Sequence, residues 1–572
     1  MAQVMTRLLA ALCTLALLAI GAAAQTRPQT IAPSIAVHAK NGMVVAQEAA
    51  AARVGADILK RGGNAIDAAV AVGFAMAVTY PRAGNIGGGG FMVIHLAKGN
   101  ENVAIDYRET APAAATPTMF LDAAGNPDPH KSRDSALSIG VPGTVAGLTL
   151  AEAKYGSGAF TLAELMAPAI DLAAKGVPVD DDTLDSLPAA RDRLARWPAS
   201  AAIFLKPDGS PLDGSDILVQ KDLAGVLRRI AHDGPAGFYE GDTAQKLAAA
   251  IQAAGGLITA GDLKNYRAVI RKPVTGTYHG YDIVSMPPPS SGGIVLLEML
   301  NILEGYDLGH APKVDAEHWI IEAMKRAYAD RAVYMGDPET VKVPVQGLIS
   351  KAYATGLRKT ITERATPAAE IHAGDPAPFE GQNTTHFSVI DRDGNAVSNT
   401  YTLNFSYGLG MVAAGTGILL NNELDDFTAK AGAANAYGLV GYAANLPGPN
   451  KRPLSSMTPT IVLKDGKPVL VTGSPGGSRI ITAVLQVILN ALDFHMPIDE
   501  AVTAPRLHDQ WLPDQVLVEP GFDPAVLAAL AARGHDIVPA QPGTSANSIA
   551  VTPDGYVGAA DTRTRGAFAI GY

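Results

Sequence analysis

Short runs of apolar and β-branched residues separated by turn residues mark the last third of the chain as a β region. Residues 384–390 and 396–403 form two such runs, and the Asp-Gly pair between them is typical of a hairpin turn. Two more Asp-Gly pairs, at residues 465–466 and 554–555, also lie between apolar runs. The pattern therefore predicts antiparallel hairpins that follow one another along the chain.

Earlier segments show the helical spacing of apolar residues instead. One hairpin is predicted there, from residues 91–96 and 102–107 around a Lys-Gly-Asn turn. Helices are predicted at residues 49–60, 65–78, 144–155, 162–175, 223–231, 244–253, 316–334, 480–492 and 524–532. Helices combined with antiparallel hairpins predict an α+β fold built in layers, in which the segments before and after residue 384 share one structure.

The first 24 residues have the organisation of a signal peptide. Arg7 provides the positive charge, residues 8–20 are apolar, and small residues precede Gln25. A membrane helix is the competing interpretation, but the apolar stretch is shorter than the roughly 20 residues that a span needs. Cys13, the one cysteine, lies inside this stretch. We therefore expect a periplasmic or secreted protein without a disulfide or a stable membrane anchor.

Composition and spacing exclude several classes of function. The net charge is −10 and the 45 Lys and Arg residues form no basic run, which argues against nucleic acid as a partner. The 12 histidines show no metal-binding spacing, and no cysteine ligand set exists, so no transition metal or other cofactor is expected. No Gly-Xaa-Ser-Xaa-Gly elbow lies between a strand and a helix, which disfavours an ordinary serine hydrolase.

Two glycine-rich segments have different sequence contexts. Residues 84–90 follow a predicted helix and lead into a strand, the reverse of the order in a phosphate-binding loop, so we interpret them as close backbone packing. Residues 473–479 lead from a strand into a helix. Consecutive glycine N–H groups at a helix N-terminus suit an oxyanion site, although a tight turn explains them equally well.

Thr384 begins the first strand of the 384–403 hairpin, directly after an Ala- and Pro-rich segment. If the chain is cut before Thr384, the new α-amine can act as the base for the hydroxyl of the same residue. An α-amine titrates at about 7.7–8.0, which suits a base at neutral pH. The alternative is that the Thr-Thr pair merely starts a strand, because Thr favours strands.

Two polar clusters follow this hairpin. Residues 421–427 place amides and carboxylates after an apolar strand, and a solvated turn is the alternative to a functional site. Residues 453–460 set adjacent hydroxyls between prolines, where a capped turn is the alternative.

Taken together, these segments resemble the signature blocks of the γ-glutamyltranspeptidases. The blocks are Gly62 to Ala69, Gly84 to Gly90, Asp106 to Glu109 with Ala111-Pro112, Thr384-Thr385-His386, Asn421 to Phe427, Lys451 to Met457 and Gly473 to Arg479. They occur in the family's order, and the similarity extends from about residue 35 to the C-terminus.

The resemblance implies a four-layer αββα sandwich of the N-terminal nucleophile hydrolase type, with two antiparallel sheets between helical layers. It implies a precursor that cuts itself between Asn383 and Thr384. The products would be a large subunit of residues 25–383 and a small subunit of residues 384–572, which remain together as a heterodimer. No cofactor or metal is implied.

The resemblance also implies roles for individual residues. Thr384 would be the nucleophile, oriented by Thr402, and the N–H groups of Gly476 and Gly477 would bind the oxyanion. Arg108 would pair with the α-carboxylate of a γ-glutamyl substrate such as glutathione. The further substrate-binding residues would be Ser455 and Ser456 for the carboxylate, and Asp426, Glu423 and Asn404 for the ammonium group. Tyr437 would belong to a lid loop at residues 431–442.

Two other functions remain as alternatives. A sibling acylase on the same scaffold, acting on glutaryl-cephalosporin amides or poly-γ-glutamate, would not need to recognise a free ammonium group. A secreted binding protein without catalysis would be expected to lack Thr384 or the oxyanion glycines, and both are present. We therefore expect a γ-glutamyltransferase that transfers the glutamyl group to water or to amino acid and peptide acceptors.

Overall fold

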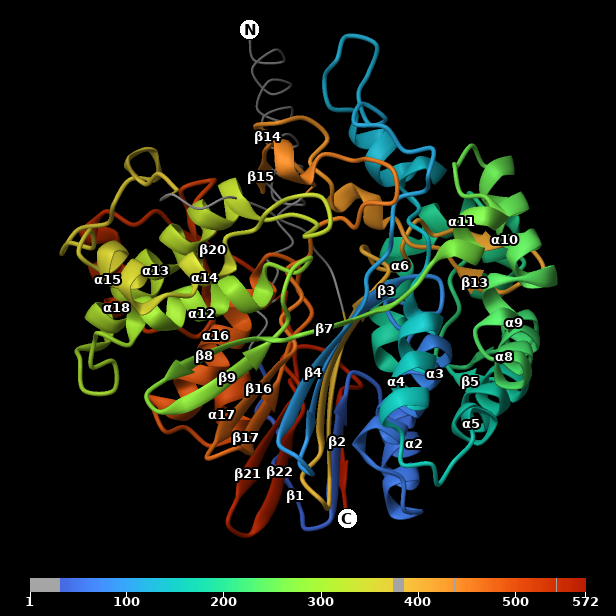
Figure 1. Cartoon of the computed structure of the whole chain (residues 1–572), viewed down its shortest axis with the longest axis horizontal. Helices are drawn as coiled ribbons and strands as arrows, with labels where there is room; N and C mark the ends of the chain where they lie inside the picture. Colours follow the sequence, from blue (N-terminus) through green and yellow to red (C-terminus); the bar gives the residue numbers. More distant parts are fainter. Residues whose placement is uncertain (1–30, 374–384, 437–438, 542) are drawn as a thin grey trace, which may run out of the picture.

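The computed structural model describes residues 31–373, 385–436, 439–541 and 543–572. Within these residues lie two large antiparallel sheets of seven strands each (Figure 1). The first sheet has the order β1 (Val37–Ala39), β22 (Gly555–Ala559), β21 (Ser548–Thr552), β17 (Lys467–Thr472), β16 (Thr460–Lys464), β9 (Tyr281–Ser285) and β8 (Val274–Tyr278). The second has the order β23 (Phe568–Gly571), β2 (Gly42–Ala46), β10 (Thr385–Asp391), β11 (Ala396–Thr402), β3 (Gly89–Leu96), β4 (Glu101–Tyr107) and β7 (Val269–Arg271).

Alternation along the strands of the second sheet shows that it is buried on both faces. Met43 and Val45 of β2 join the core between the two sheets, whereas Val44 and Ala46 pack with the helices on the other side. Phe91 alternates in the same way with Met92 on β3. Because successive side chains of a strand point to opposite faces of the sheet, one strand contributes residues to both cores.

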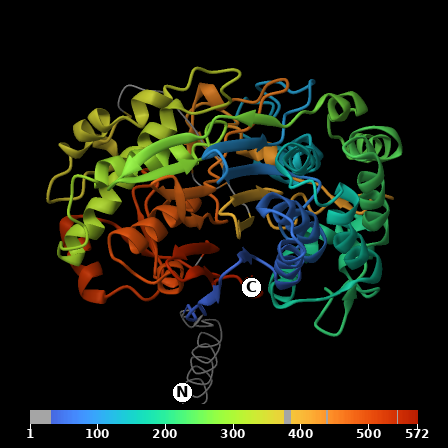
Figure 2. The ribbon, with the colours of Figure 1, turned by 60° about the horizontal axis from the view of Figure 1, so that its bottom comes forward.

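Helices cover the outer face of each sheet, and the two helical groups lie on opposite sides of the sheets in Figures 1 and 2. Beside the second sheet lie α2 (Ala49–Lys60), α3 (Ala65–Thr79), α4 (Thr144–Tyr155), α5 (Leu162–Lys175), α8 (Lys221–Asp233) and α10 (Gly241–Ala253). Beside the first sheet lie α12 (Gly292–Leu303), α13 (Lys313–Tyr334), α15 (Lys351–Arg358), α16 (Arg479–Leu492), α17 (Ile498–Thr503) and α18 (Pro524–Arg533). The expected αββα sandwich is confirmed.

The helix α3 shows how local sequence places one of these layers. Asn64 caps it by accepting hydrogen bonds from the N–H groups of Ile66 and Asp67, and the Asp67 carboxylate accepts one from the Asn64 N–H. Every residue of α3 is buried. It therefore packs as an inner helix with no solvent face.

The glycine-rich segment at residues 84–90 packs as predicted. A Cβ on Gly88 would lie 2.0 Å from the Thr402 carbonyl oxygen, and one on Gly87 would lie 2.0 Å from the Leu419 carbonyl oxygen. Side chains at these positions are therefore impossible without moving the backbone. The segment packs closely against β11 and β13 (Ile418–Leu419), which positions the end of β11.

Several helices were not predicted, and the longest of them is α6 (Asp181–Ala195). It carries two acidic residues in its first turn and Pro188 in its interior, and its apolar residues are few. The predicted helix at residues 524–532 and the hairpins around residues 465 and 554 are confirmed. In the part of the chain that is described, no helix combines the length and apolarity needed to cross a bilayer.

Candidate active site

Arg108 follows the last residue of β4 and is fully buried. Its Nε donates to the Pro453 carbonyl oxygen at 3.0 Å, and its Nη2 donates to the Leu454 carbonyl oxygen at 3.2 Å. The two Nη atoms form ion pairs with Glu423 and Asp426. The guanidinium group therefore has its position fixed by the 453–454 segment and its charge matched by two carboxylates.

Both carboxylates come from one short 3₁₀ turn, Glu423–Asp426, just after β13 (Ile418–Leu419). Asn421 anchors this turn: its Oδ1 accepts from the Glu423 N–H at 3.0 Å, and its Nδ2 donates to the Gly87 carbonyl oxygen at 2.8 Å. Glu423 and Asp426 are at most 1% exposed. The interpretation of this cluster as a solvated turn is thus wrong.

A third carboxylate, Glu109, makes this site rich in negative charge. Its Oε2 lies 3.8 Å from Nη1 of Arg108, and it is fully buried. Burial raises the pKa of Glu109 to about 8, although Arg108 acts in the opposite direction. Burial likewise raises the pKa of Glu423 well above its usual range. One guanidinium thus faces three buried acidic side chains, and burial disfavours the charged forms of Glu109 and Glu423.

The Ser455-Ser456 pair lies next to the carbonyl groups that hold Arg108. Ser455 Oγ accepts from the Met457 N–H at 3.1 Å, and Ser456 Oγ accepts from Nη2 of Arg331 on α13. Ser455 is 1% exposed and Ser456 is fully buried. In both bonds the hydroxyl oxygen accepts, and among the described residues neither hydroxyl donates to an acceptor, so each can donate to an anion.

Gly476 and Gly477 lie between β17 and α16 and have φ angles of 127° and 68°. This left-handed backbone favours glycine. A Cβ on Gly476 would lie 2.5 Å from Cγ2 of Thr544. Within the described residues, no hydrogen-bond acceptor pairs with either N–H group. The geometry agrees with a turn that exposes N–H donors before a helix.

Thr402 and Asn404 close the hairpin end nearest to this region. Thr402 is the last residue of β11, and its Oγ1 accepts from the Asn404 N–H at 2.8 Å. Asn404 has a φ of 73° and donates from Nδ2 to the Asn422 carbonyl oxygen at 2.9 Å. Asn404 and Gly476 both line a cavity of about 120 Å³, with Phe405, Pro475 and Thr544 among its walls.

Not every predicted site residue lies in the described part of the chain. Asn383, Thr384 and Tyr437 lie outside the described residues. The structure brings the predicted Arg108, Glu423 and Asp426 into direct contact. The segment that holds Arg108, Pro453-Leu454, is continuous with Ser455 and Ser456.

Sequence reasoning missed the roles of Glu109, Arg331 and Asn85. Asn85 donates from Nδ2 to the Thr402 carbonyl oxygen at 2.7 Å and so supports the end of β11. Arg331 lies in a stretch of α13 where charged residues alternate with apolar ones and are nevertheless buried. That mixture indicates buried ion pairs, but it gives no signal for the partner.

Comparison with known proteins places nearly the whole chain in one family. A family model described as γ-glutamyltranspeptidase matches residues 51–571. A glutathione hydrolase proenzyme of Escherichia coli is 53% identical over 541 residues, which cover 94% of this chain and 93% of that protein. An acylase ACY 1 proenzyme of a Pseudomonas species is 41% identical and covers 92% of each chain.

Solved structures are similar as well. A cephalosporin acylase from Bacillus halodurans superposes with a TM-score of 0.84 at 29% identity and covers 96% of this chain and 99% of that one. A γ-glutamyltranspeptidase from Helicobacter pylori gives a TM-score of 0.56 at 45% identity, covering 61% of this chain and 97% of that one. From the family match and the identity over nearly its whole length, the chain belongs to the γ-glutamyltranspeptidase family.

Proposed function

We propose that the protein is a self-processing γ-glutamyltransferase that cleaves the γ-glutamyl amide bond of glutathione and related compounds. It transfers the glutamyl group to water or to the amine of an amino acid or peptide. The observation that carries this proposal is the buried cluster of Arg108 with Glu423 and Asp426 beside the Ser455 and Ser456 hydroxyls. Such a cluster has the charges needed to recognise both an α-carboxylate and an α-ammonium group.

The internal ion pairs suggest how substrate is recognised. The α-carboxylate of the donor takes the place of a protein carboxylate on Arg108, which offers a planar bidentate fork, and accepts from Ser455 and Ser456. The α-ammonium group then pairs with Asp426 and Glu423, with Asn404 as a further contact. Every buried charge keeps a partner during this exchange, which avoids the cost of an isolated buried ion.

Processing makes the nucleophile. Thr384 Oγ attacks the carbonyl carbon of Asn383, the C–N bond breaks, and an ester joins the two segments. Water hydrolyses the ester, which leaves a carboxylate on Asn383 and a free α-amine on Thr384. The resulting subunits, residues 25–383 and 384–572, remain associated. This association is supported by the second sheet, in which β10 lies between β2 and β11, and β11 pairs with β3.

Turnover then proceeds through an acyl-enzyme. The α-amine of Thr384 accepts the hydroxyl proton as Oγ attacks the γ-amide carbon of the donor. The N–H groups of Gly476 and Gly477 stabilise the oxyanion, and one such N–H donor lowers the activation free energy by about 2.7–4 kcal/mol. Thr402 orients the nucleophile. The leaving amine takes the proton, and water or an acceptor amine resolves the γ-glutamyl ester. A lid that includes Tyr437 covers the donor.

The acylase function is the second candidate, because relatives named as acylases are 41% identical. A glutaryl group has the carboxylate of a γ-glutamyl group but lacks its ammonium. On binding, it would leave Asp426 and Glu423 without a cation to replace Arg108. The carboxylate pair therefore favours the γ-glutamyl donor.

A comparison of γ-glutamyl and glutaryl anilides tests the proposal. We expect kcat/KM for the γ-glutamyl compound to exceed that for the glutaryl compound by at least about 100-fold, equivalent to roughly 2.7 kcal/mol. Asp426→Asn should lower kcat/KM for the γ-glutamyl anilide and leave kcat/KM for the glutaryl anilide nearly unchanged, so the ratio of the two values decreases. Equal rates on both anilides, unaffected by Asp426→Asn, would show that the acylase function is correct.

A further inference from the structure

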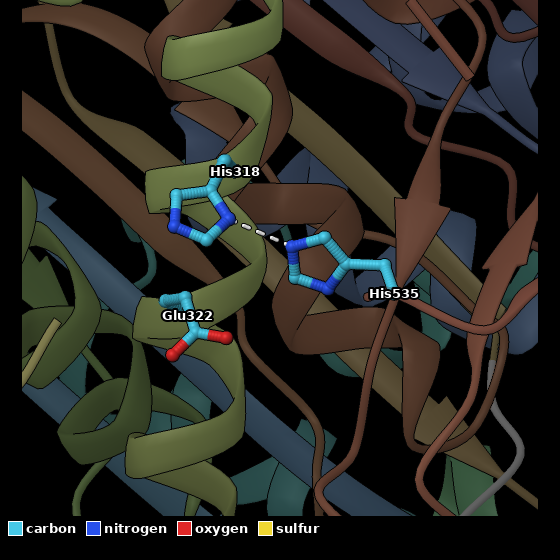
Figure 3. A group of neighbouring side chains, drawn as sticks. All are labelled: His318, Glu322 and His535. Carbon is cyan, nitrogen blue, oxygen red and sulfur yellow. Dashed lines mark hydrogen bonds between the residues drawn. The ribbon is translucent and has the colours of Figure 1, made fainter. Parts of the chain in front are cut away.

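A cluster of two histidines and a glutamate lies in the helical layer beside the first sheet. His318 and Glu322 lie one turn apart on α13, and His535 follows the end of α18. Figure 3 shows the three side chains converging, with His535 facing the other two. One ligand atom from each residue lies within 4.8 Å of the others, and all three residues are buried. This is an arrangement of side chains able to hold a metal ion.

The surroundings of His318 determine which nitrogen carries its proton. Its Nε2 lies 2.7 Å from the Thr362 carbonyl oxygen, which can only accept a hydrogen bond. Nε2 therefore carries the proton, and the lone pair of Nδ1 is directed at Nε2 of His535, 2.7 Å away. A carbonyl that fixes the tautomer of a histidine in this way is a common second shell of metal ligands.

His535 is satisfied on one side only. A hydrogen bond to His318 Nδ1 requires the proton on Nε2 of His535, which leaves Nδ1 of His535 as a buried acceptor. Among the described residues, that Nδ1 has no hydrogen-bond partner. When a metal ion takes the place of the hydrogen bond between the two rings, the ring proton of His535 moves from Nε2 to Nδ1, and Nε2 becomes free to coordinate.

Glu322 is held for coordination by three donors. Its Oε1 accepts from the Thr366 N–H at 3.0 Å, and its Oε2 accepts from Thr366 Oγ1 and from Arg326, each at 2.6 Å. Oε1 accepts one bond in this set and retains a second lone pair.

The cations around the cluster are paired with acids. Lys325 lies 2.5 Å from Asp514, and Arg533 forms an ion pair with Asp315. Arg326 pairs with Glu322 itself. The charges of Lys325 and Arg533 are thus balanced by Asp514 and Asp315, whereas Arg326 shares the carboxylate of Glu322 with the proposed metal site.

We propose that His318 Nδ1, His535 Nε2 and Glu322 Oε1 bind one zinc-class divalent ion, with water as the fourth ligand. Two imidazoles and a carboxylate form a usual zinc ligand set. Tetrahedral coordination at Zn–N of about 2.0–2.1 Å places the two nitrogens roughly 3.3 Å apart, so the rings separate by about half an ångström from their hydrogen-bonded distance.

Sequence spacing could not reveal this site, because His318 and His535 are 217 residues apart. The ligands also come from both sides of residue 384. If the chain is cut as proposed above, the ion joins the large subunit to the small one. That consequence rests on the proposed function, whereas the metal site itself does not.

The experiment measures metal binding directly. The full-length protein is stripped with a chelator and titrated with Zn²⁺ by calorimetry and with Co²⁺ by visible absorption. We expect one ion per chain, a dissociation constant at or below micromolar, and the intense Co²⁺ bands of a tetrahedral site. His535→Ala and Glu322→Gln should each weaken binding at least 100-fold. Thr366→Val, which removes a hydrogen bond to the ligand carboxylate, should weaken it about 10–100-fold.

The control variant is His310→Ala, which removes an exposed histidine that contacts Asp307 at 2.8 Å. It should bind zinc as the wild type does. Zinc should also raise the melting temperature of wild type but not of either ligand variant, and metal-free melting temperatures show whether the variants are folded. Folded ligand variants that bind Zn²⁺ as tightly as wild type, or a wild type that binds no stoichiometric ion, would overturn the proposal.

The uncut Thr384→Ala protein separates this site from the proposed function. Equal zinc affinity in the cut and uncut proteins supports the site independently of processing. In the cut protein, chelation should increase subunit dissociation during size-exclusion chromatography in mild denaturant. No change on chelation would overturn the role in joining subunits.

Discussion

Two buried arginine–carboxylate clusters in this protein differ in their charge balance. Around Arg108, one guanidinium faces Glu109, Glu423 and Asp426. In the second cluster, Arg506 and Arg563 face Asp561 and Glu519, with one positive charge for each negative one. Both clusters are buried, so burial alone does not distinguish them.

The pKa values follow the charge balance. Burial raises the pKa of Asp561, but Arg506 and Arg563 outweigh burial and hold it below its ordinary value. In the Arg108 cluster, burial outweighs the single arginine, and the pKa values of Glu109 and Glu423 rise. The balanced cluster is complete as it stands, whereas the acidic one suits an additional cation. We infer that the balanced cluster around Arg506 and Arg563 stabilises the fold, whereas the acidic cluster around Arg108 receives the substrate ammonium group.

The largest expected effect is a loss of stability when the balanced cluster is broken. Asp561→Asn leaves Arg506 and Arg563 with one carboxylate between them, and breaking a buried pair costs about 3–5 kcal/mol. The folded-state pKa of Asp561 is depressed, so its contribution is present above its unfolded pKa near 3.8 and is lost as pH falls below it. We expect a strongly lowered melting temperature at pH 7, measured by calorimetry. An unchanged melting temperature would contradict a structural role.

Arg108→Ala tests the acidic cluster, which we propose binds the substrate. Loss of the guanidinium removes the partner of the donor carboxylate, and truncation of such a buried pair costs about 2–5 kcal/mol of binding. We expect kcat/KM for a γ-glutamyl anilide to fall at least about 30-fold. Arg565→Ala, at an exposed ion pair with Asp185, is the matched control and should retain activity. Full activity in Arg108→Ala would refute the substrate assignment.

Glu109→Gln tests the raised pKa in the acidic cluster through the pH dependence of the free energy of unfolding. The folded-state pKa of Glu109 is raised to about 8, so this group favours the folded state most below its unfolded pKa near 4.5 and disfavours it progressively up to pH 8. The variant should therefore gain stability relative to wild type as pH rises from 4.5 to 8, by at most about 1.4 kcal/mol per pH unit. Denaturant unfolding at pH 5 and pH 8.5 measures this difference. An equal difference at both pH values would contradict the raised pKa.

Local patterns in the sequence predicted most elements but few of the contacts between them. The hairpin of β10 and β11 and the helix α16 follow from apolar periodicity and turn residues, which act over a few positions. The helix α6 was missed because its apolar periodicity is weak and Pro188 interrupts it. Periodicity carries no information on which element lies next to a segment far away in the chain.

The site shows the same limit. The motifs around Arg108 and residues 421–427 indicated chemistry. The ion pairs, however, join Arg108 to Glu423 and Asp426, which follow it by 315 and 318 positions in the sequence. The protonation of Glu109 depends on burial against those partners and is invisible in sequence. Resemblance to a family supplied the roles of individual residues, and the packing supplied the reason why Glu423 and Asp426 are held as a pair.

Intact mass analysis of the purified protein beside a Thr384→Ala variant tests the central claim most directly. The account predicts two fragments from wild type that divide between Asn383 and Thr384, and one uncut chain from the variant. A wild-type chain that remains uncut while soluble and folded would contradict self-processing and the nucleophile that depends on it.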